Sequence, residues 1–230
     1  MRASARLLCS SNQSHDSATV AVYALLDEPH RRVAFVNAYN AAIDKTKLNA
    51  PNQLSTREED ELYEPFQRGA FSGYCQYNDK RLDTSAAPLY LLQDQLNSFV
   101  PLTAPITCDV YIDATIYLLQ RIEYANLYHT FTEWFNAYIV LRVLGIRHAQ
   151  FVAFDARRPG ALDDVWARLF TFSDTLVRFS SYSGRLLCFR HIIFGAPGSG
   201  DIACPHTPAL PCSHVLQVRI QQRIQQRIQR

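Results

Sequence analysis

Hydrophobic residues in the middle and second half of the chain alternate between helix-like and strand-like spacings. Residues Ser85–Val100 predict an amphipathic helix in which Pro88 stands near the first turn. Residues Cys108–Leu119 are rich in β-branched and aromatic side chains and predict a strand or a hairpin. Ala149–Phe154 and Arg185–Phe194 are short apolar runs that predict buried strands. Strands that alternate with helices in this way indicate an α/β fold.

The central segment Arg121–Val140 (RIEYANLYHTFTEWFNAYIV) predicts a helix that begins near Tyr128. Asn126 is the expected N-cap residue, because its side-chain oxygen can accept a free backbone N–H of the first turn. One apolar and aromatic stripe is expected to be buried. Its members are Tyr128, Phe131, Phe135, Tyr138 and Ile139.

His129 and Glu133 are four positions apart and therefore project from the same face of this helix. A histidine and a carboxylate one turn apart can form a hydrogen-bonded acid–base pair or a pair that orients a ligand. A solvated His–Glu pair beside a core stripe has the same spacing. The spacing alone leaves both interpretations open.

A β-loop-α unit is predicted after the central helix. The strand that ends at Asp155 is followed by a polar loop and then by a helix from about Asp163. Asp163 and Asp164 lie in the first turn of that helix, where carboxylates interact favourably with the helix dipole. A paired Asp-Asp can also hold a metal ion, although stabilisation of the helix end is the commoner role.

The first 65 residues carry weaker patterns. Ser14–Leu26 predicts either a strand or a buried helical turn, and Arg32–Ile43 predicts a strand that passes into a helix. Thr56 and Glu59 form a capping-box pattern, so a short helix is expected over Thr56–Glu64.

Two glycine-containing segments have loop patterns. Phe66–Tyr74 (FQRGAFSGY) predicts a tight loop held by Cys75, because glycine allows positive φ angles. Gly195–Asp201 (GAPGSGD) has part of the phosphate-loop pattern. Asp201 stands where that loop requires a lysine, and its charge would repel phosphate, which argues against a phosphate loop.

The end of the chain is a four-residue repeat, RIQQRIQQRIQR, which places Ile220, Ile224 and Ile228 on one face if it is helical. Such a tail can be a basic amphipathic segment for a partner or an acidic surface, or a low-complexity solvated segment. The preceding cysteines and histidines, between residues 204 and 214, lack the usual spacing of a zinc site.

Composition restricts the classes of protein to which the chain can belong. It has 230 residues, of which 48% are hydrophobic and 19% charged, as expected for one or two globular domains. A net charge of +2 gives no case for nucleic acid as a partner. No apolar run approaches the roughly 18 residues of a membrane helix, and the apolar stretch at the N-terminus is too short for a signal peptide.

An ordered set of residues in the central segment carries a resemblance to a known family. The set is Asn126, Tyr128, His129, Phe131, Asn136, Tyr138 and Ile139, with Glu133 in place of an aspartate. This segment resembles the EGF-domain-specific O-linked N-acetylglucosamine transferases of glycosyltransferase family 61. The resemblance extends from about Glu61 to Phe194 and rests on the collinear order of the matching residues.

The resemblance implies a fold and a domain organisation. The expected fold is one Rossmann-like α/β half of a GT-B glycosyltransferase, with the second, nucleotide-binding half absent. The expected parts are a variable segment over residues 1–55, an acceptor-side half over 56–216 and a low-complexity tail over 217–230.

The resemblance also implies an activity. Full-length relatives would transfer N-acetylglucosamine from UDP-N-acetylglucosamine to Ser or Thr of EGF-like domains. His129 and Glu133 are then candidate catalytic residues near the acceptor, and Asp174, which matches the second residue of an Asp-x-Asp motif, is a candidate near the cleft. The first aspartate of that motif is replaced, and one carboxylate alone is a poor metal site, so no metal ligands are predicted. The alternative is an inactive, truncated or degenerate module that binds a protein partner without catalysis.

The family works in the lumen of the endoplasmic reticulum, where disulfides persist. The chain itself shows neither a signal peptide nor a retention tetrapeptide. Cys75, Cys108 and Cys188 match cysteines of the family. A Cys75–Cys108 disulfide is one pairing to consider, because the sequence does not determine connectivity.

Overall fold

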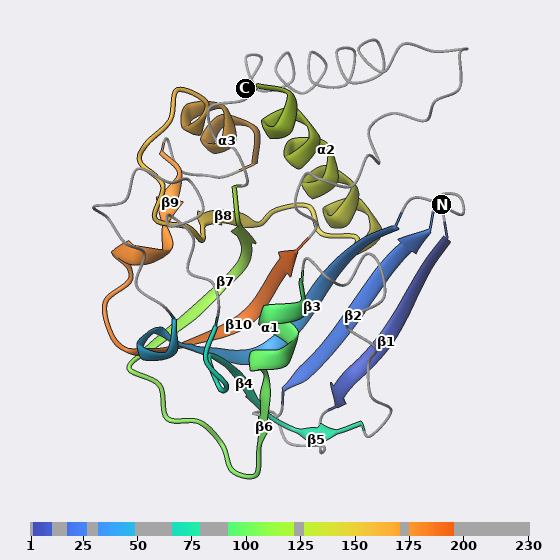
Figure 1. Cartoon of the computed structure of the whole chain (residues 1–230), viewed down its shortest axis with the longest axis vertical. Helices are drawn as coiled ribbons and strands as arrows, with labels where there is room; N and C mark the ends of the chain where they lie inside the picture. The colour runs from blue at the N-terminus through green and yellow to red at the C-terminus, as the bar shows by residue number, and fades with distance from the viewer. Residues whose placement is uncertain are drawn as a thin grey trace.

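A single mixed sheet organises the molecule (Figure 1). The structure is a computed structural model that describes residues 2–10, 18–26, 32–48, 66–78, 92–121, 127–170 and 175–195. Within these residues the sheet has ten strands, and eight of them follow the order β5-β1-β2-β3-β10-β7-β8-β9.

One half of the sheet is antiparallel and the other half is parallel. The antiparallel half consists of β1 (Arg2–Ser10), β2 (Thr19–Leu26) and β3 (Arg32–Asp44). The last strand, β10 (Leu186–Gly195), pairs antiparallel with β3 and parallel with β7, and so joins the two halves. The parallel half continues through β7 (Val110–Leu119), β8 (Gln150–Ala153) and β9 (Val177–Arg178).

Three short strands lie at the lower end of the antiparallel half. β4 (Phe71–Tyr74) pairs with β3, and β6 (Val100–Leu102) pairs with β4. β5 (Gln76–Tyr77) pairs with the end of β1.

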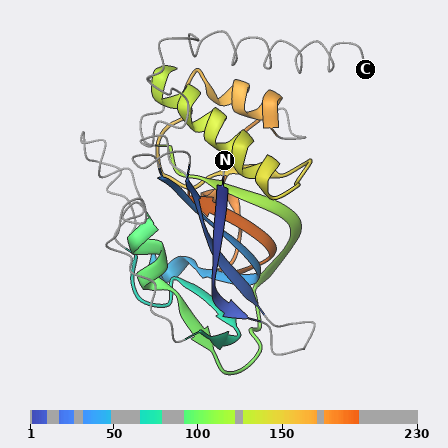
Figure 2. The same cartoon turned by 90° about the vertical axis from the view of Figure 1, so that its right-hand side faces the viewer.

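Helices cover both faces of the sheet (Figures 1 and 2). The short helix α1 (Gln93–Ser98) packs on one face, where Leu92 and Leu96 join the core cluster that contains Phe189. Helices α2 (Leu127–Val143) and α3 (Asp163–Phe170) pack on the other face, around Trp134 and Trp166. The rings of these two tryptophans meet edge to face, with centroids 5.9 Å apart. Two 3-10 turns, Lys45–Lys47 and Phe179–Ser181, complete the described elements.

Several predicted elements are confirmed, and others are wrong at their boundaries. Cys108–Leu119 contains one strand, and Ser14–Leu26 contains a strand. Arg32–Ile43 was expected to pass into a helix, but it is strand throughout, because β2 and β10 supply hydrogen-bonding partners on both sides. Within Ser85–Val100 the described helix ends at Ser98, and residues 85–91 lie outside the described part. The helix expected over Thr56–Glu64 also lies outside it.

Helix α2 is present as predicted, but it buries a different face. The expected stripe is only half-buried where its side chains are described, at Phe131, Phe135, Tyr138 and Ile139. The buried face consists of Thr130, Glu133, Trp134, Asn136, Ala137, Val140 and Leu141. The helix is apolar on nearly every side, so spacing alone did not identify the face that meets the sheet.

The C-terminus of α2 is closed by a Schellman motif. The N–H of Gly145 donates to the carbonyl of Arg142, and the N–H of Ile146 donates to the carbonyl of Leu141. Gly145 has φ +68°, the left-handed conformation that this motif requires.

Two disulfides connect distant parts of the sheet. Cys9 of β1 pairs with Cys75, which follows β4, and Cys108 pairs with Cys188 of β10. Both pairs have Cα atoms 5.8 Å apart. The Cys75–Cys108 pairing considered from the sequence is therefore replaced by two other pairings. The loop expected over Phe66–Tyr74 is a turn followed by strand β4.

Candidate functional site

The parallel strands bring four chain segments to one edge of the sheet. β7, β8, β9 and β10 run in the same direction, so the residues at and after their C-terminal ends lie side by side. Open α/β sheets bind ligands outside this edge. The candidate site is therefore built from the residues that follow these strands.

A small cavity of about 20 Å³ lies at this edge, between the ends of β7 and β10. That volume is enough for about one water molecule. Its polar lining comes from α1, β7, the residue after β7, and α2. The lining residues with polar side chains are Gln95, Tyr117, Gln120 and Glu133.

Hydrogen bonds fix part of this lining. The Gln95 Nε2 donates to Gln120 Oε1 at 3.1 Å, which ties α1 to the end of β7. The Tyr117 hydroxyl donates to the carbonyl of Gly195 at 3.2 Å, which ties β7 to the end of β10. The cavity walls are therefore held by three elements far apart in the sequence.

Glu133 is the one acidic side chain in this lining, and it is only 2% exposed. Its burial excludes the solvated His–Glu interpretation for Glu133. Burial raises the pKa of the Tyr117 hydroxyl, and the negative charge of Glu133 raises it further. A neutral phenol and an acidic side chain thus share the cavity.

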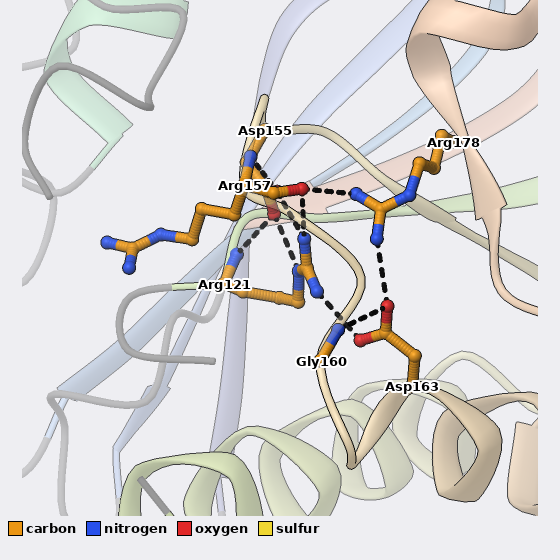
Figure 3. Close-up of polar contacts among 6 residues, drawn as sticks. All are labelled: Arg121, Asp155, Arg157, Gly160, Asp163 and Arg178. Carbon is orange, nitrogen blue, oxygen red and sulfur yellow. Dashed lines mark hydrogen bonds and ion pairs between the residues drawn. The ribbon is translucent and has the colours of Figure 1, made fainter. Parts of the chain in front are cut away.

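A network of charged residues holds the same edge next to the cavity (Figure 3). Arg121 follows β7 and Asp155 follows β8, and both are 1% exposed. The backbone N–H and Nε of Arg121 donate to Asp155 Oδ2 at 3.2 and 2.9 Å, and Nη2 donates to Asp155 Oδ1 at 2.5 Å. The backbone N–H of Arg157 also donates to Asp155 Oδ1, at 3.0 Å.

Asp163 extends this network to β9. It accepts from Arg121 Nη1 at 2.7 Å, from Arg178 Nη2 at 2.8 Å and from the backbone N–H of Gly160 at 3.1 Å. The carbonyl of Arg157 accepts from both Arg121 and Arg178. The ends of β7, β8 and β9 and the start of α3 are thereby joined into one unit, as Figure 3 shows.

The network suits a positioning role. Burial alone would lower the pKa of Arg121, but the hydrogen bonds and charges of Asp155 and Asp163 outweigh it and raise the pKa. Arg121 therefore stays charged at every physiological pH. The carboxylates of Asp155 and Asp163 each accept several hydrogen bonds, so they hold the loops in place.

A further buried polar group lies on the sheet and does not line the cavity. His191 of β10 bonds through Nε2 to Asn37 Oδ1 at 2.6 Å and through Nδ1 to Thr115 Oγ1 at 3.1 Å, and its ring stacks on Tyr39. Because an amide oxygen only accepts, Nε2 donates and Nδ1 accepts from the threonine hydroxyl. Burial, with a smaller effect of Arg190, lowers the pKa of His191 to about 4, so the ring is neutral at physiological pH.

The structure describes the side chain of only one of the three candidate catalytic residues. Glu133 lies in the cavity. His129 lies in α2 one turn earlier, and its side chain is outside the described part of the chain, as is Asp174. The structure thus does not test whether the three come together. Among the described residues no group of His, Cys, Asp or Glu is arranged to hold a metal ion, and Asp163 binds arginines instead.

Sequence reasoning missed most of the other site residues. Arg121 and Gln120 directly follow an apolar strand, as Asp155 does, and this position is the signal that could have identified them. Gln95 and Arg178 carry no comparable signal. Each reaches the site only through the folded arrangement of α1 or β9.

Comparison with known proteins shows which proteins the chain is similar to. No family model matches the chain. Beta-1,2-xylosyltransferase of Arabidopsis thaliana is 32% identical over 112 residues, which are 44% of this chain and 20% of the relative. Beta-1,2-xylosyltransferase RCN11 of Oryza sativa subsp. japonica is 30% identical over 123 residues, 52% of this chain and 22% of the relative. The chain is similar to glycosyltransferases.

A third relative matches over a longer stretch. The EGF domain-specific O-linked N-acetylglucosamine transferase of Bos taurus is 25% identical over 201 residues, which are 82% of this chain and 35% of the relative. The chain spans about a fifth to a third of the length of the curated relatives it matches. No described helix is both long and apolar enough to cross a membrane.

Proposed function

We propose that the chain is the acceptor-side part of a family 61 glycosyltransferase and that Glu133 acts on the acceptor hydroxyl. One observation carries the proposal. Glu133 belongs to the segment with the family resemblance, and it is the one acidic side chain that lines a small, mainly apolar cavity at the C-terminal edge of the parallel strands. Similarity to sugar transferases supports the reaction class.

The proposed reaction moves a sugar from a nucleotide diphosphate carrier to a Ser or Thr hydroxyl of a protein. The acceptor oxygen forms a bond to the anomeric carbon, the bond from that carbon to the diphosphate breaks, and the hydroxyl proton passes to a base. Glu133 is the proposed base. Since the cavity is large enough for about one water molecule, we propose that a water in it carries the proton to the carboxylate.

The proposal also includes a donor, an acceptor, two catalytic partners and a cellular compartment. UDP-N-acetylglucosamine is the proposed donor and an EGF-like domain the proposed acceptor, as the name of the bovine relative suggests. His129, one turn before Glu133, and Asp174, near the cleft, remain proposed catalytic partners. The mixed α/β sheet is compatible with one half of a GT-B enzyme, in which a second half would hold the nucleotide. The two disulfides favour an oxidising compartment, and we propose the lumen of the endoplasmic reticulum.

The test replaces the carboxylate by an amide of the same size. Glu133→Gln is expected to lower kcat by roughly 100-fold or more, because a general base contributes about 10² to 10⁴. UDP release would be measured with UDP-N-acetylglucosamine and a folded EGF-like domain. Asp113→Asn is the control, since its side chain is 74% exposed and bonds only to Arg190 in the described structure. Equal activity of the two variants would remove Glu133 from the mechanism.

A second candidate function is an acceptor-binding module without catalysis. The observation in its favour is the replaced first aspartate of the Asp-x-Asp motif, because Asp174 alone would be a poor metal site. Calorimetric titrations with an EGF-like domain, UDP-N-acetylglucosamine and UDP-xylose separate the two. Binding of the EGF-like domain without donor binding or UDP release selects the second function. Absence of binding to every probe rejects both functions.

A further inference from the structure

The hydroxyl of Tyr117 lies between the end of β10 and the cavity that Glu133 lines. Tyr117 belongs to β7, is 1% exposed and lines the same cavity. Its hydroxyl donates to the carbonyl of Gly195 at 3.2 Å. β7 and β10 already pair along their length, up to Leu118 and Phe194. A tie between these two strands therefore does not by itself account for a tyrosine hydroxyl in the cavity wall.

Packing fixes both partners of this hydrogen bond. The ring of Tyr117 stacks on Phe151 with centroids 4.6 Å apart and an interplanar angle of 12°, and Phe151 is 0% exposed. Gly195 has φ +105°, and Leu92 and Phe35 crowd its Cα. Neither the ring nor the carbonyl has space to turn, so the phenol oxygen keeps one position in the cavity wall.

The hydrogen bond to Gly195 determines what the phenol oxygen does toward the cavity. A phenol has one proton and a carbonyl oxygen only accepts, so the proton of Tyr117 lies in the bond to Gly195. The phenol keeps that proton, because burial and the negative charge of Glu133 both raise the pKa of Tyr117. Toward the cavity, the oxygen of Tyr117 is therefore an acceptor of hydrogen bonds only.

The cavity has the size and the polar groups that one ordered water requires. Its volume of about 20 Å³ is enough for about one water molecule, and a buried water typically makes about three hydrogen bonds. Gln95, Tyr117, Gln120 and Glu133 supply polar partners, while the other side chains of the lining are apolar. A water that donates one proton to Tyr117 has its second proton for Glu133 and its lone pairs for an incoming hydroxyl.

We propose that Tyr117 is a positioning residue that orients a cavity water between the acceptor hydroxyl and Glu133. The inference rests on the proposed function, in which Glu133 is the base. The acceptor hydroxyl gives its proton to the water, and the water gives its other proton to Glu133, so that the water is restored. The acceptor oxygen bonds to the anomeric carbon, and the diphosphate leaves with the electron pair of the broken bond. The proton of Tyr117 stays in its bond to Gly195.

A matched pair of tyrosine variants tests the kinetic role. Tyr117→Phe removes the phenol oxygen and keeps the ring that stacks on Phe151. The kcat per folded chain is expected to fall about tenfold, while KM for the acceptor stays unchanged, because the water loses its orientation and the acceptor loses no contact. UDP release with UDP-N-acetylglucosamine and a folded EGF-like domain gives both constants, and near-UV circular dichroism gives the folded fraction.

Tyr182→Phe is the control for the loss of a tyrosine hydroxyl. Tyr182 is half-buried, packs on Phe179 and does not line the cavity, so its kcat is expected to stay unchanged. Equal kcat values per folded chain in the two variants would overturn the inference.

High-resolution crystal structures of the full chain test the water without donor or acceptor. The unchanged chain and Tyr182→Phe are expected to hold a water within about 3.2 Å of both the Tyr117 hydroxyl and a Glu133 carboxyl oxygen. In Tyr117→Phe this water is expected to move or to be lost. A dry cavity, or a water that contacts Glu133 but not Tyr117, would overturn the inference. Full activity of Glu133→Gln would overturn the proposed function instead, whether or not the water is present, so the two failures are distinguishable.

Discussion

Arg121 combines almost complete burial with a permanent charge. It is 1% exposed, and its guanidinium is held by Asp155 and Asp163 at 2.5 to 2.9 Å. Two carboxylates thus depend on one cation for compensation, with help from Arg178 at Asp163. Removing one member of a buried ionic group leaves the other charges without compensation, which is why such losses are large.

We predict that Arg121→Met destabilises the protein by about 3 to 5 kcal/mol. Urea unfolding followed by tryptophan fluorescence measures the loss. Arg190→Met is the control, because Arg190 and Asp113 form a pair whose side chains are 63% and 74% exposed. Its loss is expected to stay below about 1 kcal/mol. Similar losses in the two variants would show that the network contributes no more than a surface pair.

The sequence predicted the positions of two members of the ionic network but not which residue they bind. Asp155 was expected at a strand end and Asp163 at a helix start, and the structure has both there. Their common partner could not be predicted, because Arg121 lies 34 and 42 residues before them. Spacing along one helix relates Glu133 to His129, whereas only the folded sheet relates Arg121 to Asp155.

At the scale of elements, the end of β10 is packed more closely than the end of α2. Gly195 has φ +105°, and a Cβ atom there would lie 2.7 Å from Leu92 Cδ2 and 3.0 Å from Phe35 Cα. Gly145 also has a positive φ, +68°, but a Cβ atom there would meet nothing within 4 Å. Replacing Gly145 by alanine would therefore introduce backbone strain alone, whereas replacing Gly195 would introduce both backbone strain and steric crowding.

We predict that Gly195→Ala destabilises the protein more than Gly145→Ala does. Left-handed backbone costs an alanine about 1 to 2 kcal/mol at either position. Crowding at residue 195 adds roughly 1 to 3 kcal/mol. Urea midpoints of the two variants measure the difference. If both variants lose the same stability, the contacts of Leu92 and Phe35 with this strand end are looser than described.

The type of an element was predictable where its residues favour only a helix or only a strand. It was unpredictable where the residues are compatible with both. The β-branched and aromatic run of β7 predicted a strand or a hairpin and is one strand, and the helix predicted from about Asp163 is α3. In β3 the segment NAYNAAID has good helix formers, and only its neighbours β2 and β10 make it a strand. Local preference there is overridden by pairing that connects residues more than 140 positions apart.

At the scale of the whole molecule, two disulfides close long loops across the sheet. They join residues 66 and 80 positions apart. The chain-entropy account assigns such loops about 4 kcal/mol each, and losses on removal are typically about 2 to 5 kcal/mol. The described fold thus depends on an oxidising environment for a substantial part of its stability.

We predict that Cys9→Ser with Cys75→Ser lowers the free energy of unfolding by about 2 to 5 kcal/mol. Thermal and urea unfolding under non-reducing conditions measure the change. Cys204→Ser with Cys212→Ser is the control, since neither residue belongs to the two disulfides. A reductant should then lower the stability of the control to a greater extent than that of the first variant. Unchanged stability on losing the Cys9–Cys75 bond would contradict this account.

The fold class was predictable from residue 85 onward, whereas the N-terminal segments gave only ambiguous patterns, with a strand as one of two possibilities over Ser14–Leu26. Strand–helix alternation in the second half corresponds to the parallel strands β7, β8 and β9 with α2 and α3. The described residues among the first 44, whose patterns were weak, form three strands of the same sheet. Their side chains alternate imperfectly, so long-range pairing rather than local pattern determines their structure.

The place of β10 at the centre of the sheet has a consequence for synthesis of the chain. β3 and β7 are complete long before the ribosome adds Leu186–Gly195, yet β10 is the strand that each of them pairs with. Until that strand emerges, both halves expose an unpaired hydrogen-bonding edge, and Cys108 has no partner. During this interval the unpaired edges of β3 and β7 can form hydrogen bonds with strands of other chains. A folding chaperone is then expected to bind these exposed edges.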